Sequence, residues 1–206
     1  YLPVDEFAKK LINQGMILGT SAFAARIEGS NTFISEDLID KQSVQYIHVD
    51  VSFVNASNEM DIAAFKAWRK DYGCAEFKTS SDGSFKVKRE VEKMSKSKYN
   101  VVNPDAICET YGADALRLYE MFLGPLEQYK PWNTAGITGV FNFLKKLWKL
   151  YFNDSGLRIT ENPPSKQALR TLHKTIKKVT EDIEHFSFNT SVSNFMIAVN
   201  ELSAQK

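Results

Sequence analysis

The sequence predicts an α+β fold, mostly helical, with a small α+β insertion module, a lysine- and serine-rich loop with short helices, and a partial antiparallel α-helix bundle. Short β-prone runs interrupted by Gly, Asn or Asp indicate hairpins in the first half. After the Pro163-Pro164 break, apolar residues recur at spacings of three and four, as in helices that pack in a bundle.

The first 19 residues are predicted to form a short helix followed by a short buried strand. Phe7, Leu11 and Ile12 have helical spacing, and Gly15 is suited to end the helix. The run MILG that follows is typical of a buried strand. We interpret residues 1–19 as the edge of a larger βα domain.

Residues 20–90 are predicted to form the small α+β module. RIEGSNTFIS and EFKTSSDGSFKVK each favour a hairpin, and Asp82-Gly83 is the stronger turn signal. Between them, the alternation in QYIHVDVSFV indicates a half-buried strand. NEMDIAAFKAWRKDYG then favours a helix that ends at Gly73. The place of this module, between a strand and a motif, indicates an insertion.

Residues 91–135 contain the loop and two short helices. Asn103 is a favourable N-cap, Pro104 suits the first helical position, and Gly112 is expected to end the first helix. ADALRLYEMFLGP is the second predicted helix.

Residues 136–206 are predicted to be almost entirely helical. Val140, Phe143, Leu144, Leu147 and Tyr151 share one helical face. A long helix follows Ser165, and its predicted packing face consists of Leu169, Leu172, Ile176, Val179, Ile183 and Phe186. A partner helix is expected to contribute Phe188, Val192, Phe195, Met196, Val199 and Leu202.

The composition limits the possible functions. The 206 residues carry a formal net charge of +1, so a nucleic-acid-binding surface requires local clustering of basic residues. Cys74 and Cys108 lie far apart in no paired motif, which argues against a disulfide framework and a zinc site, and favours a reducing, cytoplasmic setting. No apolar run is long enough to span a bilayer.

The stretch EKMSKSKYNVVNP combines lysines with small hydroxyl residues just before a proline-initiated helix. A lysine ammonium offers three donors on a long stem, and serine hydroxyls add short-range donors without bulk. Such a loop, centred on KMSKS at 93–97, suits an anionic ligand whose charge shifts during a reaction. The alternative from composition alone is a solvated basic turn.

KMSKS is the second signature of class I aminoacyl-tRNA synthetases. The longer run KMSKSKYNVVNPDAICETYGADALRLYEMFLGP resembles the leucyl-tRNA synthetase family, and PWNTAGITGVFNFLKKLW, FAKKLINQGMILG and FNTSVSNFMIAVNEL are similar to the same family. The resemblance covers most of the chain and is weakest at 20–90.

The resemblance implies ATP-dependent activation of leucine and transfer of leucine to tRNA(Leu). Lys93 and Lys96 would stabilise the triphosphate in the transition state, Met94 and Ser95 would border the adenine through their backbone, and Ser97 would hold the loop's shape. Mg²⁺ would accompany ATP on phosphate oxygens, with no protein-bound zinc. The enzyme is expected to be a cytoplasmic monomer without membrane contact.

The resemblance also assigns each region. It implies the C-terminal edge of a Rossmann catalytic domain at 1–19, the leucine-specific insertion module at 20–90, the KMSKS loop and stem-contact helices at 91–135, and a partial anticodon-binding bundle at 136–206. The remaining Rossmann half and the editing domain are expected elsewhere in the same polypeptide.

Two features depart from the family pattern. Tyr99 stands where these enzymes usually have glycine, and the first signature, His-x-Gly-His, is absent around His48, His173 and His185. We therefore expect the segment to be inactive by itself. Two alternatives stay open: a synthetase of the isoleucine, valine or methionine type, and a non-catalytic tRNA-binding module with a vestigial loop.

The helical region offers further candidate tRNA contacts. Lys145, Lys146 and Lys149 could bind tRNA phosphates, although a solvated helix face explains them equally well. Trp68, Trp132 and Trp148 are expected to pack in cores or at domain interfaces rather than to stack on nucleotides.

Overall fold

The computed structural model describes residues 3–159 and 161–205, which divide into two compact units. The sheet unit consists of residues 17–102, and the helical unit combines the chain up to residue 16 with the chain from residue 103. Within the described ranges lie six α-helices and a mixed sheet, so the predicted α+β class is confirmed. No helix in these ranges is long and apolar enough to cross a membrane.

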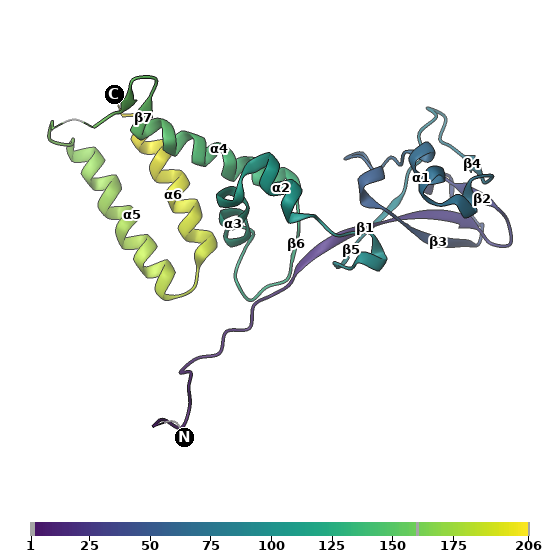
Figure 1. Ribbon diagram of the computed structural model, residues 1–206, viewed down its shortest axis with the longest axis horizontal. Helices are drawn as coiled ribbons and strands as arrows, with labels where there is room; N and C mark the ends of the chain where they lie inside the picture. The colour runs from purple at the N-terminus through teal and green to yellow at the C-terminus, as the bar shows by residue number, and fades with distance from the viewer. Residues whose placement is uncertain (1–2, 160, 206) are drawn as a thin grey trace. The chain divides into compact units, whose positions relative to one another are not determined.

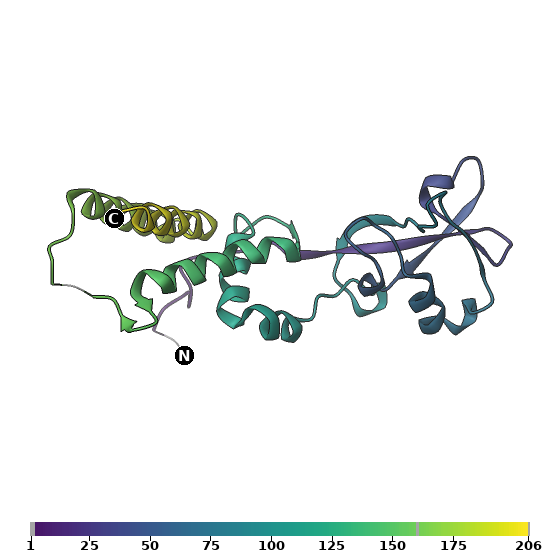
Figure 2. The same ribbon diagram turned by 90° about the horizontal axis from the view of Figure 1, so that it is seen from above.

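A long strand, β1 (Ile17–Ile27), is the centre of the sheet unit (Figure 1) and is seen from above as the extended purple arrow in Figure 2. One edge of β1 pairs antiparallel with β3 (Val44–Val49). Its other edge pairs antiparallel with β5 (Lys88–Lys93) along the first half and with β2 (Thr32–Ile34) near the end. β4 (Glu76–Lys78) adds to β2 in parallel.

The core of the sheet unit is aromatic and lies between the sheet and helix α1 (Ile62–Trp68). Phe33 on β2 and Phe65 on α1 are fully buried, with their ring centroids 5.4 Å apart. Asp61 begins α1 by accepting a hydrogen bond from the amide of Ala64 at 3.0 Å, as an N-cap residue does. The sheet and this helix thus share one hydrophobic core, which supports β5 and the loop that follows it.

The two predicted hairpins have different outcomes. β1 and β2 form the first one, with Gly29 at a φ of 72° in the connecting turn. The second is wrong: the turn at Asp82-Gly83 forms, but β4 pairs with β2 rather than with the residues after the turn. The physical reason is the core, because Phe77 of β4 stacks on Phe33 at 5.0 Å.

The strand predicted over residues 45–54 is shorter than expected. β3 ends at Val49, and a 3₁₀ turn, Val51–Phe53, follows. Asp50 terminates the strand because its side chain accepts a hydrogen bond from the Ser52 amide at 2.9 Å, which stabilises the turn.

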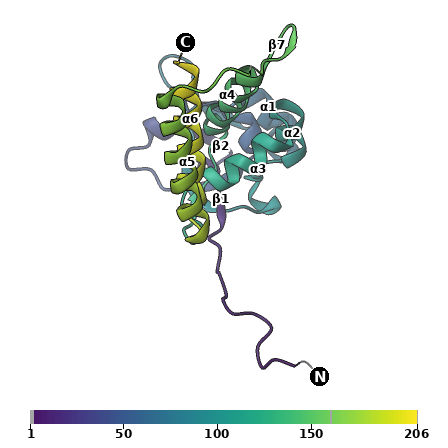
Figure 3. The same ribbon diagram turned by 90° about the vertical axis from the view of Figure 1, so that its left-hand side faces the viewer.

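The described residues of the helical unit form five α-helices, and Figure 3 shows α5 and α6 lying side by side. Asn103 accepts a hydrogen bond from the Asp105 amide at 3.0 Å and Gly112 has a φ of 87°, which confirms both predicted boundaries of α2. A hairpin of β7 and β8 after α4 was not predicted. The elements are α2 (Pro104–Tyr111), α3 (Ala113–Phe122), β6 (Lys130–Pro131), α4 (Thr134–Tyr151), β7 (Phe152–Asn153), β8 (Gly156–Leu157), α5 (Lys166–Glu184) and α6 (Phe188–Ser203).

The helix predicted within residues 1–19 is wrong. Residues 3–16 contain no helix or strand, and Phe7 and Leu11 are 89% and 84% exposed. A short helix depends on packing of its apolar face, and no described residue covers these side chains. Gly15 instead donates a backbone hydrogen bond to Leu126 at 2.9 Å, which fixes this segment in an extended form.

The apolar face predicted for the long helix exists on α5 but is not buried. Five of its six residues are between 36% and 53% exposed: Leu169, Leu172, Ile176, Ile183 and Phe186. Polar residues occupy the buried side instead, where the Thr171 hydroxyl donates to Glu201 of α6 at 2.8 Å and Asp182 is 3% exposed. The spacing therefore predicted the helix correctly and its contact with α6 incorrectly.

Candidate functional site

The KMSKS residues, Lys93–Ser97, follow directly from strand β5 into a single 3₁₀ turn, Lys96–Lys98. The Lys98 amide donates to the carbonyl of Ser95 at 3.0 Å, and the hydroxyls of Ser95 and Ser97 lie 2.9 Å apart. The loop thus belongs to the sheet unit, because β5 pairs with β1 up to the first residue of the motif.

A buried asparagine joins the two ends of the loop. Asn100 is 1% exposed, and its Oδ1 accepts a hydrogen bond from the Ser95 amide at 2.8 Å. Its Nδ2 donates to Ser21 Oγ on β1 at 2.9 Å and to the carbonyl of Lys93 at 3.3 Å. Sequence reasoning missed Asn100, for which the only signal was one polar residue placed between Tyr99 and an apolar pair.

A carboxylate at the base of the loop binds three neighbours. Ser21 Oγ donates to Glu92 Oε2 at 2.6 Å, Lys98 Nζ lies 3.0 Å from Oε1, and His48 Nε2 lies 3.5 Å from Oε2. The hydrogen bond from Ser21, followed by that from Lys98, holds the pKa of the Glu92 carboxyl below its usual value. The carboxylate form therefore fixes Lys98 beside the sheet.

The contribution of Glu92 to stability is expected to depend on pH. Because the folded state lowers the pKa of Glu92, the contribution is complete above the usual value of 4.5 and is lost as the pH falls through the lower folded value. The free energy of unfolding of the wild type, compared with Glu92→Gln, should therefore exceed that of the variant at about pH 7 and converge with it toward about pH 3. A difference that is the same at both pH values would contradict this role.

Gly19 on β1 leaves room for the end of the loop. A Cβ atom at this position would lie 2.6 Å from the carbonyl oxygen of Asn100 and 3.0 Å from Cγ of Met94. We expect Gly19→Ala to lower the free energy of unfolding by about 1–3 kcal/mol, because the backbone at Asn100 must move. Gly139→Ala is the control: nothing lies within 4 Å of its Cβ position in α4, and alanine should stabilise that helix by up to about 1 kcal/mol. Equal effects in urea titrations would contradict the close approach.

The predicted site residues differ in whether they already contact other residues of the sheet unit. Lys93 and Lys96 are exposed, and neither ammonium group is within ion-pair distance of a carboxylate in the described part of the chain. Met94 lies half-buried beside Gly19, and the Ser95 amide is already bonded to Asn100. The loop consequently presents two ammonium groups on a fixed base, an arrangement that suits a polyanion.

Tyr99 has an unusual backbone conformation at the end of the 3₁₀ turn. Its φ of 52° lies in the left-handed region, which costs a residue other than glycine about 1–2 kcal/mol. Its ring packs edge-on against Trp68 with centroids 4.7 Å apart, a contact of the kind that contributes about 0.5–1.5 kcal/mol. The aromatic contact thus offsets much of the backbone strain.

The three lysines predicted to contact tRNA lie at two different places on α4. Lys146 and Lys149 line a shallow pocket of about 520 Å³ together with Arg158, and Lys146 Nζ donates to Asn200 Oδ1 at 3.1 Å. Lys145 instead lies over the Phe141 ring, 4.0 Å from its centroid. Sequence reasoning missed Arg158, which the β7–β8 hairpin brings to this pocket.

The three tryptophans differ in how far their side chains are buried. Trp68 and Trp132 are half-buried and pack against aromatic neighbours, as expected. The expectation for Trp148 is wrong, because this side chain is 63% exposed and stacks on Phe152 at 4.1 Å. Its place near the end of α4 leaves one face of the ring without a core to pack against.

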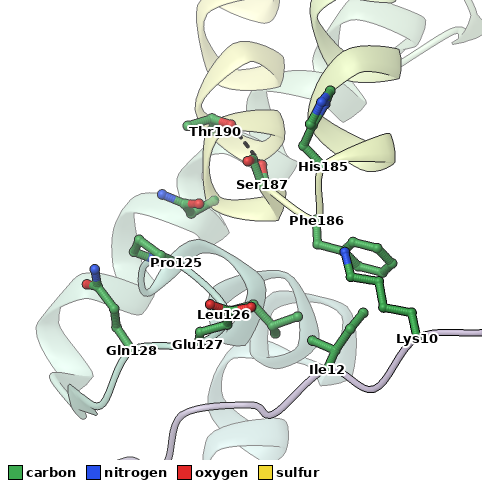
Figure 4. A pocket seen from close by; sticks show the side chains of 11 residues that line it. Lys10, Ile12, Pro125, Leu126, Glu127, Gln128, His185, Phe186, Ser187 and Thr190 are labelled. Atoms are coloured by element: carbon green, nitrogen blue, oxygen red, sulfur yellow. Dashed lines mark hydrogen bonds between the residues drawn. The ribbon is translucent and has the colours of Figure 1, made fainter.

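Another pocket, of about 370 Å³, lies where residues 10–12 and 125–128 approach the turn between α5 and α6 (Figure 4). Lys10 extends over the Phe186 ring, 5.0 Å from its centroid, and the Thr190 hydroxyl donates to the carbonyl of Ser187 at 2.8 Å. None of the predicted site residues lines this pocket, so we do not assign it to the KMSKS loop.

Comparison with known proteins first gives a match to one class of enzymes. The sequence model of the class I tRNA synthetases (I, L, M and V) matches residues 73–129, a range that contains the loop and the two helices after it. This is the class to which the KMSKS signature pointed.

Two individual relatives that match the whole chain are leucine–tRNA ligases. The leucine–tRNA ligase of Flavobacterium johnsoniae is 66% identical over 205 residues, which are 100% of this chain and 22% of the relative. That of Christiangramia forsetii is 66% identical over 206 residues, 100% of this chain and 21% of the relative. A crystal structure of the Agrobacterium radiobacter K84 agnB2 LeuRS–tRNA–LeuAMS ternary complex is 28% identical, with a TM-score of 0.46 over 54% of this chain and 16% of that chain.

The sequence relatives confirm the resemblance inferred from the motif and its neighbours. The chain is homologous over its whole length to a segment of leucine–tRNA ligases, and it spans about a fifth of the length of these relatives.

Proposed function

We propose that this chain is the part of a leucine–tRNA ligase that supplies the KMSKS loop and tRNA-binding helices. The observation that carries the proposal is the 66% identity to leucine–tRNA ligases over the whole chain, together with an intact loop whose Lys93 and Lys96 are exposed. The full activity requires the remainder of the same polypeptide, with its Rossmann half and editing domain.

The proposed reaction has two steps. The carboxylate of leucine attacks the α-phosphate of ATP, a new P–O bond forms, and the bond to the β-phosphate breaks, so that leucyl-adenylate and pyrophosphate result. A terminal ribose hydroxyl of tRNA(Leu) then attacks the carbonyl carbon of the adenylate and releases AMP.

The role of the loop lies in the first step. Lys93 and Lys96 stabilise the negative charge that develops on the departing pyrophosphate, and Ser97 hydrogen-bonds within the turn. Met94 and Ser95 border the adenine through their backbone, although the Ser95 amide is reserved for Asn100, which leaves its carbonyl and the Met94 backbone for this contact. Mg²⁺ enters as part of the ATP substrate, on phosphate oxygens.

The direct test is leucine-dependent exchange of pyrophosphate into ATP by the complete protein, measured with each standard amino acid. Leucine should support the fastest exchange, and the 206-residue chain alone should support none because it lacks the His-x-Gly-His signature. Fastest exchange with isoleucine, valine or methionine would favour the related synthetases. Absence of exchange with every amino acid would favour a tRNA-binding module with a vestigial loop.

The proposed tRNA interface is the basic pocket at the end of α4. Lys146, Lys149 and Arg158 place three cationic groups around one hollow, a suitable arrangement for phosphates of the tRNA backbone. Lys145 joins this interface less directly, because its ammonium lies over Phe141.

We expect Lys149→Ala with Arg158→Ala to weaken tRNA(Leu) binding by the complete protein and to reduce the slope of log K against log [salt] by about two, because each substitution leaves one tRNA phosphate without its cationic partner. Lys41→Ala, which removes an exposed lysine outside the helical unit, is the control and should leave the slope unchanged. An unchanged slope in the double variant would remove the pocket from the interface.

The regional assignment belongs to the same proposal. Residues 1–19 are assigned to the edge of the catalytic domain, 20–90 to the leucine-specific insertion, 91–135 to the loop with its stem-contact helices, and 136–206 to the anticodon-binding bundle. The ligase is proposed to act as a monomer in the cytoplasm, where its tRNA and ATP substrates are present.

A further inference from the structure

The residue that ends the 3₁₀ turn of the loop is held by its backbone and its side chain together. Tyr99 has a φ of 52°, where glycine is favoured, and its carbonyl accepts a hydrogen bond from the Val51 amide at 3.1 Å. A glycine could adopt this backbone without strain, so the geometry of the turn alone does not require a large aromatic residue here.

The Tyr99 ring connects the loop to the core of the sheet unit. Its neighbour Trp68 lies at the end of α1, 4.7 Å away between ring centroids. Trp68 in turn contacts Phe53 at 5.7 Å and Phe65, which is fully buried, at 6.1 Å. A continuous series of aromatic contacts therefore runs from the core to the residue directly after Lys98.

The exposed lysines lack such support. Lys96 begins the turn and is exposed, whereas Tyr99 ends the same turn and donates its backbone amide to the Lys96 carbonyl at 3.3 Å. Movement of Tyr99 would therefore move the backbone that carries Lys96.

We propose that Tyr99 is a positioning residue: its ring, packed against Trp68, holds the KMSKS turn in the conformation that presents Lys96 to the triphosphate. This inference rests on the proposed function of the loop. Loss of the ring would lower the fraction of molecules in this conformation, and the apparent affinity for ATP falls in proportion to that fraction. The chemistry of the bound complex stays the same, so KM for ATP changes and kcat does not.

The test compares three variants in the complete ligase. Tyr99→Gly removes the ring and the backbone strain together, Tyr99→Phe keeps the ring, and Trp68→Leu removes the partner. We expect Tyr99→Gly to raise KM for ATP in pyrophosphate exchange about tenfold with kcat within about twofold, and Tyr99→Phe to resemble the wild type. Trp68→Leu should act like Tyr99→Gly, and the double variant should be no worse than either single one.

A second measurement does not depend on ligase activity. Trypsin cleaves after lysine, so the rate of cleavage after Lys96 and Lys98 reports how often the turn opens. Cleavage should be about tenfold faster in Tyr99→Gly and unchanged in Tyr99→Phe, with equal melting temperatures showing that the fold is retained. If wild-type protein shows no leucine-dependent exchange, the proposed function fails, while cleavage still decides the role of Tyr99.

Three results would overturn the inference. One is a Tyr99→Gly variant with wild-type KM and wild-type cleavage, which would show that the ring does not stabilise the conformation of the turn. Another is an equal loss in Tyr99→Phe, which would assign the effect to the hydroxyl. The third is a Trp68→Leu variant with wild-type KM and wild-type cleavage, because the inference assigns the effect to the contact between Tyr99 and Trp68.

Discussion

Replacement of Lys96 by alanine in the complete ligase is expected to lower the rate of leucine-dependent pyrophosphate exchange by about two to three decades. A donor aimed at developing negative charge contributes about 3–4 kcal/mol to transition-state stabilisation, and each 1.36 kcal/mol corresponds to about tenfold in rate. Lys96 fits this role because its ammonium is exposed at the start of the turn and has no carboxylate partner among the described residues.

Two other lysines of the sheet unit serve as controls for this experiment. Lys41→Ala removes an exposed lysine outside the loop and should leave the exchange rate unchanged. Lys98→Ala removes a lysine that is paired with Glu92 at 3.0 Å, so it should have a smaller effect than Lys96→Ala. An unchanged rate in Lys96→Ala, or the same loss in Lys41→Ala, would contradict the assignment.

Replacement of Asn100 by alanine is expected to lower the free energy of unfolding of the sheet unit by about 3 kcal/mol. The change removes three hydrogen bonds at a residue that is 1% exposed, and each buried donor or acceptor left unsatisfied costs about 1–3 kcal/mol. The Ser95 amide and Ser21 Oγ would lose a partner, and the two ends of the loop would separate.

The measurement needs a signal from the sheet unit alone. In the 206-residue chain, replacing Trp132 and Trp148 by phenylalanine leaves Trp68 as the single tryptophan, so its fluorescence in urea reports unfolding of residues 17–102. Asn31→Ala is the matched control, because its exposed side chain has no hydrogen bond in the described residues, and it should change stability by less than about 0.5 kcal/mol. Equal effects of the two substitutions would show that Asn100 does not join the loop.

Local signals predicted the boundaries that depend on neighbouring residues. Asn103, Pro104 and Gly112 set the ends of α2, because capping and positive φ are properties of one or two positions. The KMSKS motif similarly predicted an exposed lysine loop. In these cases the conformation of a residue is determined mainly by interactions with its neighbours in the sequence.

The errors arose where distant residues decide the structure. Gly15 and Phe7 suggested a helix, but a backbone contact with Leu126 fixes the segment and no core covers Phe7. Strand β4 pairs with β2 because its Phe77 stacks on Phe33. Periodicity identifies the apolar face of a helix but not the element that covers it. For this reason the side of α5 that is buried against α6 was predicted incorrectly.

In the candidate site, too, features set by neighbouring residues were predictable and contacts between distant residues were not. Lys93 and Lys96 were proposed from the motif, but their support by Asn100, Glu92 and the Tyr99–Trp68 contact depends on residues as much as 79 positions apart in the chain. Such contacts leave no short pattern in the sequence. The loop was therefore predictable as a chemical feature, and its supporting contacts required the structure.

The most direct test of the account measures the chemical reactivity of each lysine in the complete ligase with an amine-acylating reagent and mass spectrometry. Binding of ATP with Mg²⁺ should slow acylation of Lys93 and Lys96 several-fold, whereas AMP, which lacks the β- and γ-phosphates, should not. Lys98, already paired with Glu92, and Lys41, outside the loop, should react equally in all conditions. If ATP leaves Lys93 and Lys96 as reactive as before, the loop does not bind the triphosphate and the central claim is wrong.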